Sequence, residues 1–278
     1  MMPLEKFVIT VQYPTEDRGF SCDLRVDQTG LTEWTVRSNS LTSEDPTVGV
    51  YQTNIGPQRA SELRTTLEML DKRGLPAHEP LPPGEDLPVI SLEQNGQVRS
   101  ERVDPHLSSP AICKTSEHFK GVILQARRNP IRTITLKTSV HPDAVLPNQP
   151  LRFSLFLEAN GTENVQVAYP APKSTRLGGV IVWAMRSDIP IEERWPQHSK
   201  QLTLAAEHLI EKILPQPGDE NYIVLSPAQT AQFQCSVPID WEPGEYDLRI
   251  IYFTLGSDPS VLNGRITSQP TTLTVRPQ

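Results

Sequence analysis

The sequence predicts a mainly β protein, in which a small α+β unit is followed by a larger β-sandwich. Proline is frequent, with 27 residues against 15 glycines in a chain of 278, and proline is excluded from helix interiors and central strands. Apolar side chains alternate with period two along most of the chain, as they do in half-buried strands. Aromatic residues make up only 6% of the chain, which disfavours long core helices.

The first unit is predicted over residues 1–74. Alternating apolar residues indicate a meander of four short strands, near residues 7–13, 20–26, 31–36 and 48–53. Gly56-Pro57 then opens a helix, because proline at the first helical position gives up an N–H that has no helical partner. Apolar residues follow at spacings of three and four, and Gly74 is the expected C-terminal cap. A meander followed by a helix forms a compact α+β unit.

A proline-rich linker is predicted over residues 75–88, which hold five prolines. Beyond it, two strands flank Asn95-Gly96, a dipeptide typical of two-residue hairpin turns. Residues 104–118 read as irregular, and residues 119–126 read as a strand. The segment 89–130 is therefore expected to be a hairpin and bridging segment, which either completes the first sheet or forms a separate bridge.

Residues 131–278 are predicted to form the sandwich, from seven or so short strands separated by turns. Leu151 and the next three alternate residues give a regular inward face, and Asn160-Gly161 ends that strand. Residues 200–214 are predicted to be an inserted helix, since their apolar residues recur at spacings of three and four and Pro215 follows. This succession of strands is typical of immunoglobulin-like sandwiches.

The late hairpin of the sandwich carries the clearest pattern in the chain. Pro243 presets φ for a tight turn, and Gly244 supplies the positive φ that such a turn requires at its next position. Four apolar residues then alternate on one face of the following strand: Tyr246, Leu248, Ile250 and Tyr252. No catalytic motif stands beside this strand.

The C-terminal half resembles bacterial immunoglobulin-like modules, including BsuPI-type intracellular proteinase inhibitors. The shared pattern is the Pro-Asn-Gln-Pro-Leu-Arg-Phe start at 147–153, the Asn160-Gly161 turn, and Pro-Gly-Glu-Tyr at 243–246. The resemblance covers about half of the chain, and the helix expected at 200–214 departs from it. It implies an immunoglobulin-like fold and a role in binding a protein such as a protease.

The first unit is similar to emfourin-type metalloprotease inhibitors. It shares a hairpin that ends in Gly19-Phe20, a Val26-Asp27 turn, and a meander followed by a helix. Arg18 stands where those domains usually carry the first glycine of a Gly-Gly-Phe step. The resemblance implies a protease-binding loop around Gly19.

Charge and composition exclude several classes of function. The net charge is −7 and no dense Lys/Arg run is present, whereas nucleic-acid binding requires a basic patch. Residues 1–13 lack the apolar core of a signal peptide, and no apolar run is long enough to span a membrane. Three widely separated cysteines, Cys22, Cys113 and Cys235, are expected to be reduced thiols. We therefore expect a cytoplasmic protein that binds neither nucleic acid nor membranes.

Motifs for catalysis, metals and cofactors are absent from the sequence. There is no HExxH zinc motif, no GxSxG elbow, no phosphate-binding glycine loop and no calcium loop. We therefore predict no catalytic residue, no metal and no cofactor. The alternative is an enzyme whose site assembles at the domain junction from dispersed residues: Cys113, His118 and His141.

Two polar segments hold the residues that we expect to bind a partner. Arg18, Gly19 and Phe20 form the end of the first hairpin loop, and Arg194 and Trp195 lie in a charged connection before Pro196. Aromatic residues ringed by charge are typical of binding hot spots, although Trp195 could equally fold back over the edge of the sandwich, and the hairpin loop could be only a turn. The sequence thus favours a non-enzymatic protein-interaction protein, in its most specific form an inhibitor of a protease or other enzyme.

Overall fold

The computed structural model describes residues 6–14, 22–39, 47–68, 87–104, 106, 108–171, 177–190, 198–216, 221–256 and 260–277. The chain divides into two compact units. Unit 1 comprises Met1–Ser38 and Val50–Ile131, and unit 2 comprises Asn39–Gly49 and Arg132–Gln278. The predicted mainly β fold class is confirmed, because antiparallel sheets dominate the described residues.

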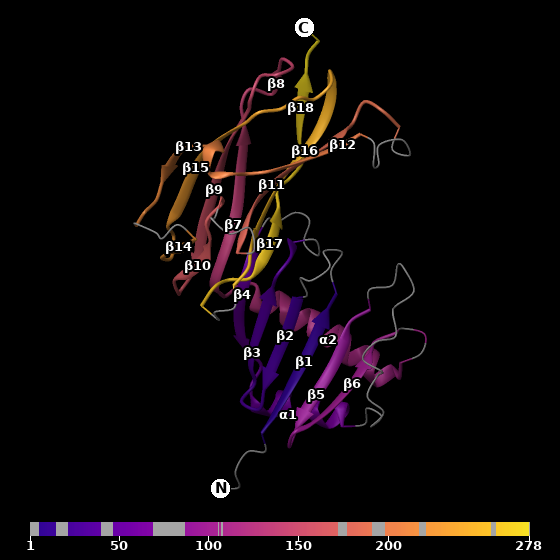
Figure 1. Cartoon of the computed structure of the whole chain (residues 1–278). Coiled ribbons are helices and arrows are strands. Elements are labelled where there is room, and N and C mark those ends of the chain that lie inside the picture. The colour runs from indigo at the N-terminus through magenta and orange to yellow at the C-terminus, as the bar shows by residue number, and fades with distance from the viewer. Residues whose placement is uncertain are drawn as a thin grey trace. The chain divides into compact units, whose positions relative to one another are not determined.

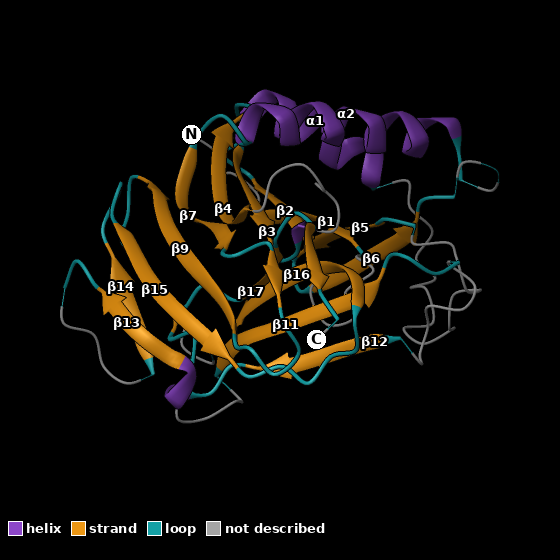
Figure 2. Cartoon of the chain, turned by 90° about the horizontal axis from the view of Figure 1, so that it is seen from above, coloured by secondary structure: helices purple, strands orange, loops and turns teal. Residues whose placement is uncertain are grey.

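Unit 1 is a sheet covered on one face by two helices (Figures 1 and 2). Its elements in chain order are β1 (Phe7–Tyr13), β2 (Cys22–Asp27), β3 (Leu31–Val36), β4 (Thr47–Asn54), α1 (Pro57–Leu67), β5 (Val89–Gln94), β6 (Gln97–Arg102) and α2 (Pro110–Ala126). The strands lie side by side in the order β4-β3-β2-β1-β5-β6. The predicted meander is therefore confirmed. The β5–β6 hairpin completes this sheet rather than forming a separate bridge, since β5 pairs with β1.

The core of unit 1 lies between the sheet and the helices. Phe7, Ile9 and Val11 alternate on one face of β1 and are buried. That face is turned toward α1, because the Arg64 guanidinium of α1 lies 5.6 Å from the centre of the Phe7 ring. Leu63 and Leu67 are buried on α1. Each such buried aliphatic side chain stabilises the fold by about 1.5–3 kcal/mol.

Helix α1 begins as the sequence predicts. Pro57 occupies its first turn, and Gly56 is the N-cap with a φ of 80°. The spacing of the buried Ala60, Leu63 and Leu67 places them on one face. The predicted end of the helix at Gly74 lies outside the described residues.

Helix α2 replaces the strand predicted for residues 119–126 and the irregular structure predicted for residues 110–118, and those parts of the prediction were wrong. Ser109 caps the helix by accepting a hydrogen bond from the Ile112 N–H at 3.4 Å, and Pro110 occupies the first turn. The buried Phe119, Val122 and Ala126 recur at three- and four-residue spacing. The cap and proline together were an available helix-start signal.

Unit 2 is a sandwich of two sheets (Figure 1). Its elements in chain order are β7 (Pro130–Val140, shared with unit 1), β8 (Ala144–Val145), β9 (Leu151–Gly161), β10 (Val165–Ala168), β11 (Gly178–Arg186), β12 (Ser199–Thr203), the 3-10 helix η2 (Ala206–His208), β13 (Leu209–Ile213), β14 (Tyr222–Leu225), β15 (Thr230–Val237), β16 (Gly244–Thr254), β17 (Gly264–Thr267) and β18 (Thr271–Val275). One sheet has the order β13-β15-β9-β7, and the other β12-β11-β16-β18-β8, with β17 also on β16 and a separate β10–β14 pair.

Alternating residues from the two sheets fill the core of unit 2. Leu151, Phe153, Leu155 and Leu157 are all buried on β9, as their spacing predicts. The same holds on β16 for the four alternating residues Tyr246, Leu248, Ile250 and Tyr252. Gly244 begins that strand with a φ of 156°.

The helix predicted near residues 200–214 is absent, and that prediction was wrong. β12 pairs with β11, whereas β13 pairs with β15 in the other sheet, and only the short η2 lies between them. Backbone pairing with two sheets outweighs the helical spacing of the apolar residues. As a result, Ile210 and Ile213 are 60% and 52% exposed rather than buried on a helix face.

Candidate functional site

The residues predicted to bind a partner, Arg18, Gly19, Phe20, Arg194 and Trp195, lie outside the described residues.

The three residues of the predicted dispersed enzyme site have separate surroundings. Cys113 and His118 both lie on α2, five positions apart, which corresponds to about 140° around the helix axis. The Cys113 thiol points to the Ser108 carbonyl at 3.9 Å. His141 belongs to unit 2, where its Nε2 lies 2.5 Å from the Ser139 hydroxyl. Helix α2 thus directs Cys113 and His118 to different neighbours.

His118 instead lines a groove between α1 and α2, the two helices that lie side by side over the sheet in Figure 2. We call this the helix groove. Its volume is about 530 Å³, and it is lined by Arg59, Glu62, Leu63 and Thr66 of α1 and by Ala111, Lys114, Thr115, Glu117 and His118 of α2.

Arg59 links the two walls of the helix groove. Its Nη1 donates to Glu62 Oε2 at 2.7 Å, one turn along α1. On the other side, its Nε and Nη2 lie 3.4 and 3.2 Å from the ring nitrogens of His118 on α2. A permanently charged side chain therefore contacts one neighbour on each wall of the groove.

The Arg59 guanidinium also shifts the pKa values of its two neighbours. The pKa of His118 is lowered, first by partial burial and then by the positive charge of Arg59, while Glu62 opposes the shift. The pKa of Glu62 is lowered mainly by the hydrogen bond from Arg59. At neutral pH, His118 is therefore a neutral acceptor and Glu62 a carboxylate.

The helix groove combines charges of both signs around an apolar floor. Leu63 is only 4% exposed and forms part of that floor, while Lys114 and Glu117 are exposed on the α2 side. The hydroxyls of Thr66 and Thr115 donate to carbonyls of their own helices. Such a lining suits a polar polypeptide segment, whose side chains and amides find both donors and acceptors.

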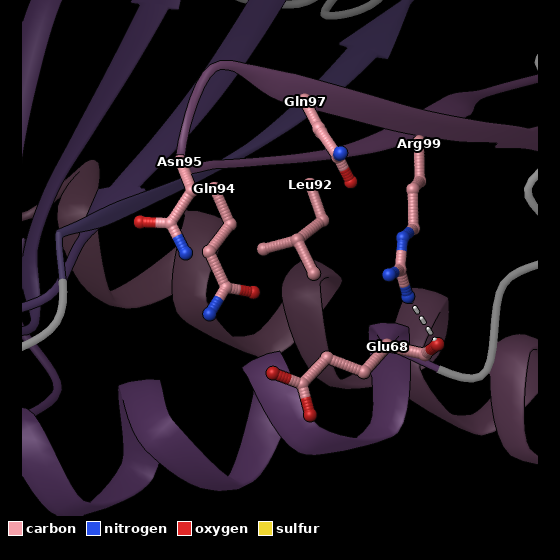
Figure 3. Close-up of a pocket in the computed structure, with 6 residues that line it drawn as sticks. All are labelled: Glu68, Leu92, Gln94, Asn95, Gln97 and Arg99. Atoms are coloured by element: carbon pink, nitrogen blue, oxygen red, sulfur yellow. Dashed lines mark hydrogen bonds between the residues drawn. The ribbon is translucent and has the colours of Figure 1, made fainter.

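A second hollow lies between the end of α1 and the β5–β6 hairpin, with a volume of about 400 Å³. Figure 3 shows the side chains of Glu68, Gln94 and Gln97 gathered around Leu92. Arg99 Nη1 donates to the main-chain oxygen of Glu68 at 2.6 Å, which satisfies a carbonyl at the end of α1. Arg99 therefore joins the hairpin to that helix end.

The described residues give little support for a metal site or for a reactive cysteine. No three His, Cys, Asp or Glu side chains gather there as metal ligands. Cys22 and Cys235 are buried, and burial raises the pKa of both thiols, that of Cys235 to about 12. Thiols with a raised pKa are poor nucleophiles at neutral pH. Within the described residues, no helix is long and apolar enough to cross a membrane.

The helix groove was not predicted from the sequence, although two signals pointed toward it. Arg59 and Glu62 are spaced to pair on α1, and Ser109-Pro110 marks the start of α2. His118 was singled out only as a partner for Cys113. The pairing of His118 with Arg59, 59 positions away, depends on how the two helices pack.

Comparisons with known proteins leave the family open. No protein-family model and no curated protein matches the chain. Among solved structures, the chain is similar to the ApaA protein from Bordetella pertussis, with 14% identity over 53% of this chain and 97% of that one, at a TM-score of 0.29. It is also similar to AvmM, which catalyses macrocyclization in alchivemycin A biosynthesis, with 11% identity over 51% and 88% at a TM-score of 0.28. The sporulation control protein Spo0M from Bacillus subtilis matches with 12% identity over 51% and 49%, at a TM-score of 0.29.

Proposed function

We propose that this protein is a non-enzymatic, cytoplasmic protein-interaction protein, and that a segment of its partner lies in the helix groove. The observation that carries the proposal is the Arg59 guanidinium, fixed between Glu62 and His118 above the apolar floor. The partner would be a protein, with neither nucleic acid nor a membrane involved, in keeping with a net charge of −7.

The rigidity of the helix groove supports binding. Holding an arginine in place before the partner arrives lowers the side-chain entropy lost on association. The groove is also built on two helices that pack on a sheet, so its width is set by the core of unit 1. Preorganised charges on rigid elements give specificity and fast association.

The specific form of the proposal is the inhibition or neutralisation of a protease or other enzyme. It rests on the resemblance of the two halves of the sequence to BsuPI-type and emfourin-type inhibitors. The helix groove would then hold a surface segment of the target enzyme.

The test is quantitative affinity capture with the full-length protein in extracts of its source organism. A partner recovered in stoichiometric amount is purified, and its affinity is compared among wild type, Arg59→Glu and Lys114→Glu. Both substitutions reverse a charge that lines the groove. Lys120→Glu is the matched control, because Lys120 is exposed on the same helix but does not line the groove.

We expect the two groove variants to bind at least about tenfold more weakly, mainly through slower association, and the control to bind like wild type. Equal binding by all four proteins would show that the partner does not use the groove. The absence of any stoichiometric partner would contradict the proposal itself.

A further inference from the structure

Strand β6 is the last strand of the unit 1 sheet (Figure 1). One side of β6 pairs with β5, and among the described residues no strand pairs with its other side. An unpaired edge of this kind presents a row of free N–H and C=O groups that another strand can use.

The turn of the hairpin determines which residues of β6 face outward. Asn95 and Gly96 have φ of 52° and 73°, the values of a type I′ turn, so the pair Gln94–Gln97 that closes the turn is hydrogen-bonded. Bonded pairs then recur at every second residue, and the Val103 N–H indeed donates to Pro88 O at 2.8 Å. The N–H and C=O groups of the alternate residues Val98, Ser100 and Arg102 therefore point away from β5.

We propose that β6 pairs antiparallel with β6 of a second copy of this chain, with Ser100 opposite Ser100 on the two-fold axis. This register aligns all three outward-facing residues, because Val98 then lies opposite Arg102 of the second copy. Six backbone hydrogen bonds form, two at Ser100 and two at each Val98–Arg102 pair. The Arg102 carbonyl, which already accepts from the Ser108 hydroxyl at 3.1 Å, uses its second lone pair for the new bond. The sheets of the two copies become continuous.

Charges on β6 select this register. Arg99 lies opposite Glu101 of the second copy, and the two-fold axis repeats the pair. These are non-hydrogen-bonded positions, where cross-strand side chains approach most closely. Moving the axis by one residue in either direction sets Arg99 against Arg99, or Glu101 against Glu101. Only the Ser100 register gives opposite charges.

Val98, Arg99 and Glu101 are positioned to make the new contacts, whereas the Nε of Arg102 is already buried within its own chain. Val98 is 62% exposed and would be covered by the aliphatic stem of Arg102 from the second copy. Arg99 donates one N–H to the Glu68 carbonyl (Figure 3). The other N–H groups of its guanidinium remain available to Glu101 of the second copy.

An edge strand of unit 2 shows why this property belongs to β6. Strand β13 also ends a sheet and carries the adjacent charges Glu211 and Lys212. A two-fold axis at either residue sets like charges opposite each other, which is a common protection of edge strands. The β13 edge therefore supplies a control.

The test is sedimentation velocity of the full-length protein, from micromolar to near-millimolar concentration. A single pair of edge strands buries little surface, so we expect a weak, concentration-dependent dimer of twice 31.1 kDa. Glu101→Arg should weaken it about tenfold, because both ion pairs become Arg–Arg contacts. The double variant Arg99→Glu/Glu101→Arg restores opposite charges at both pairs and should dimerise like wild type.

Two further variants test whether the dimer needs the β6 backbone and whether a change of net charge alone disrupts it. Ser100→Pro removes an outward N–H that β5 does not use, so it should abolish the dimer and leave the hairpin folded. Glu211→Arg on β13 changes the net charge as Glu101→Arg does and should leave the dimer unchanged. A wild type that stays monomeric throughout, a dimer that survives Ser100→Pro, or a folded double variant that does not dimerise would each overturn the proposal.

Discussion

Arg59 is the residue on which the candidate site depends, because it contacts both walls of the helix groove. It donates to Glu62 on its own helix and meets the imidazole of His118 on the other. The exposed pair with Glu62 contributes little to stability. The consequence of the arrangement is electrostatic, since one cation contributes to lowering the pKa values of two neighbours.

We predict that Arg59→Gln raises the pKa of His118 part of the way to its ordinary value. Removing the guanidinium takes away one of the two causes that lower this pKa, while partial burial remains. Titration of the imidazole by NMR measures the change. Arg99→Gln is the control, because Arg99 contacts Glu68 instead. An unchanged or lower His118 pKa in Arg59→Gln would contradict this description of the groove.

The same shift predicts a pH dependence of stability. The folded pKa of His118 lies below the unfolded value of 6.5, so the unfolded chain binds the proton more readily. His118 therefore lowers the free energy of unfolding as the pH falls through 6.5, and its effect stops changing below the folded pKa. Urea unfolding at several pH values should show a smaller loss in this window for His118→Gln than for wild type.

Tyr246 and Tyr13 form a contrasting pair of buried hydroxyls. Tyr246 Oη donates to the Glu242 carbonyl at 2.9 Å, as in the tyrosine corner of many sandwiches. The buried Tyr13 hydroxyl has no partner among the described residues, and burial raises its pKa to about 12.

We predict that Tyr246→Phe lowers the free energy of unfolding by about 1 kcal/mol, the value of one such hydrogen bond. Tyr13→Phe should leave it unchanged or raise it by about 1 kcal/mol, because an unsatisfied buried polar group is removed. Chemical denaturation of both variants measures the difference. Equal destabilisation by the two substitutions would contradict the hydrogen-bond assignment.

At the scale of elements, the turn between β2 and β3 packs against the start of α1. Gly30 has a φ of 83°, and a Cβ at this position would lie 2.4 Å from the backbone of Gly56, the N-cap of α1. Gly96 in the β5–β6 turn has a similar φ of 73° but open space around it. Comparing alanine substitutions at the two glycines therefore distinguishes the cost of a positive φ from the cost of a close contact between backbones.

We predict that Gly96→Ala lowers the free energy of unfolding by about 1 kcal/mol, the cost of the left-handed conformation alone. Gly30→Ala should lower it by about 3 kcal/mol, because backbone atoms must also move. Thermal or urea unfolding gives both values. If the two variants lose the same stability, the contact between the turn and the helix start is not tight.

The elements differ in how far local sequence determines them. Alternation predicted the strands of the meander and of the sandwich, and Gly56-Pro57 predicted the start of α1. Residues 200–214 show the limit, since the same apolar spacing serves two strands that pair with different sheets. Helix α2 is signalled by Ser109-Pro110, whereas the short stretch of residues 119–126 taken alone predicts a strand.

At the scale of the whole molecule, the chain passes between its two units three times, between Ser38 and Asn39, within β4 and within β7. The mainly β class was predictable because period-two alternation covers most of the chain. The helix groove was not, because Arg59 and His118 come from helices separated by the linker and the β5–β6 hairpin. Which side chains meet across two helices depends on packing rather than on local pattern.

The central claim is that a partner protein occupies the helix groove, and site-specific photo-crosslinking tests it most directly. A photoreactive amino acid replaces Thr66 inside the groove, or Leu124, which is 63% exposed on α2 outside the groove. The proposal predicts one dominant crosslinked protein from position 66 that is lost on adding Arg59→Glu, and little product from position 124. Equal products from both positions, or none from position 66, would contradict it.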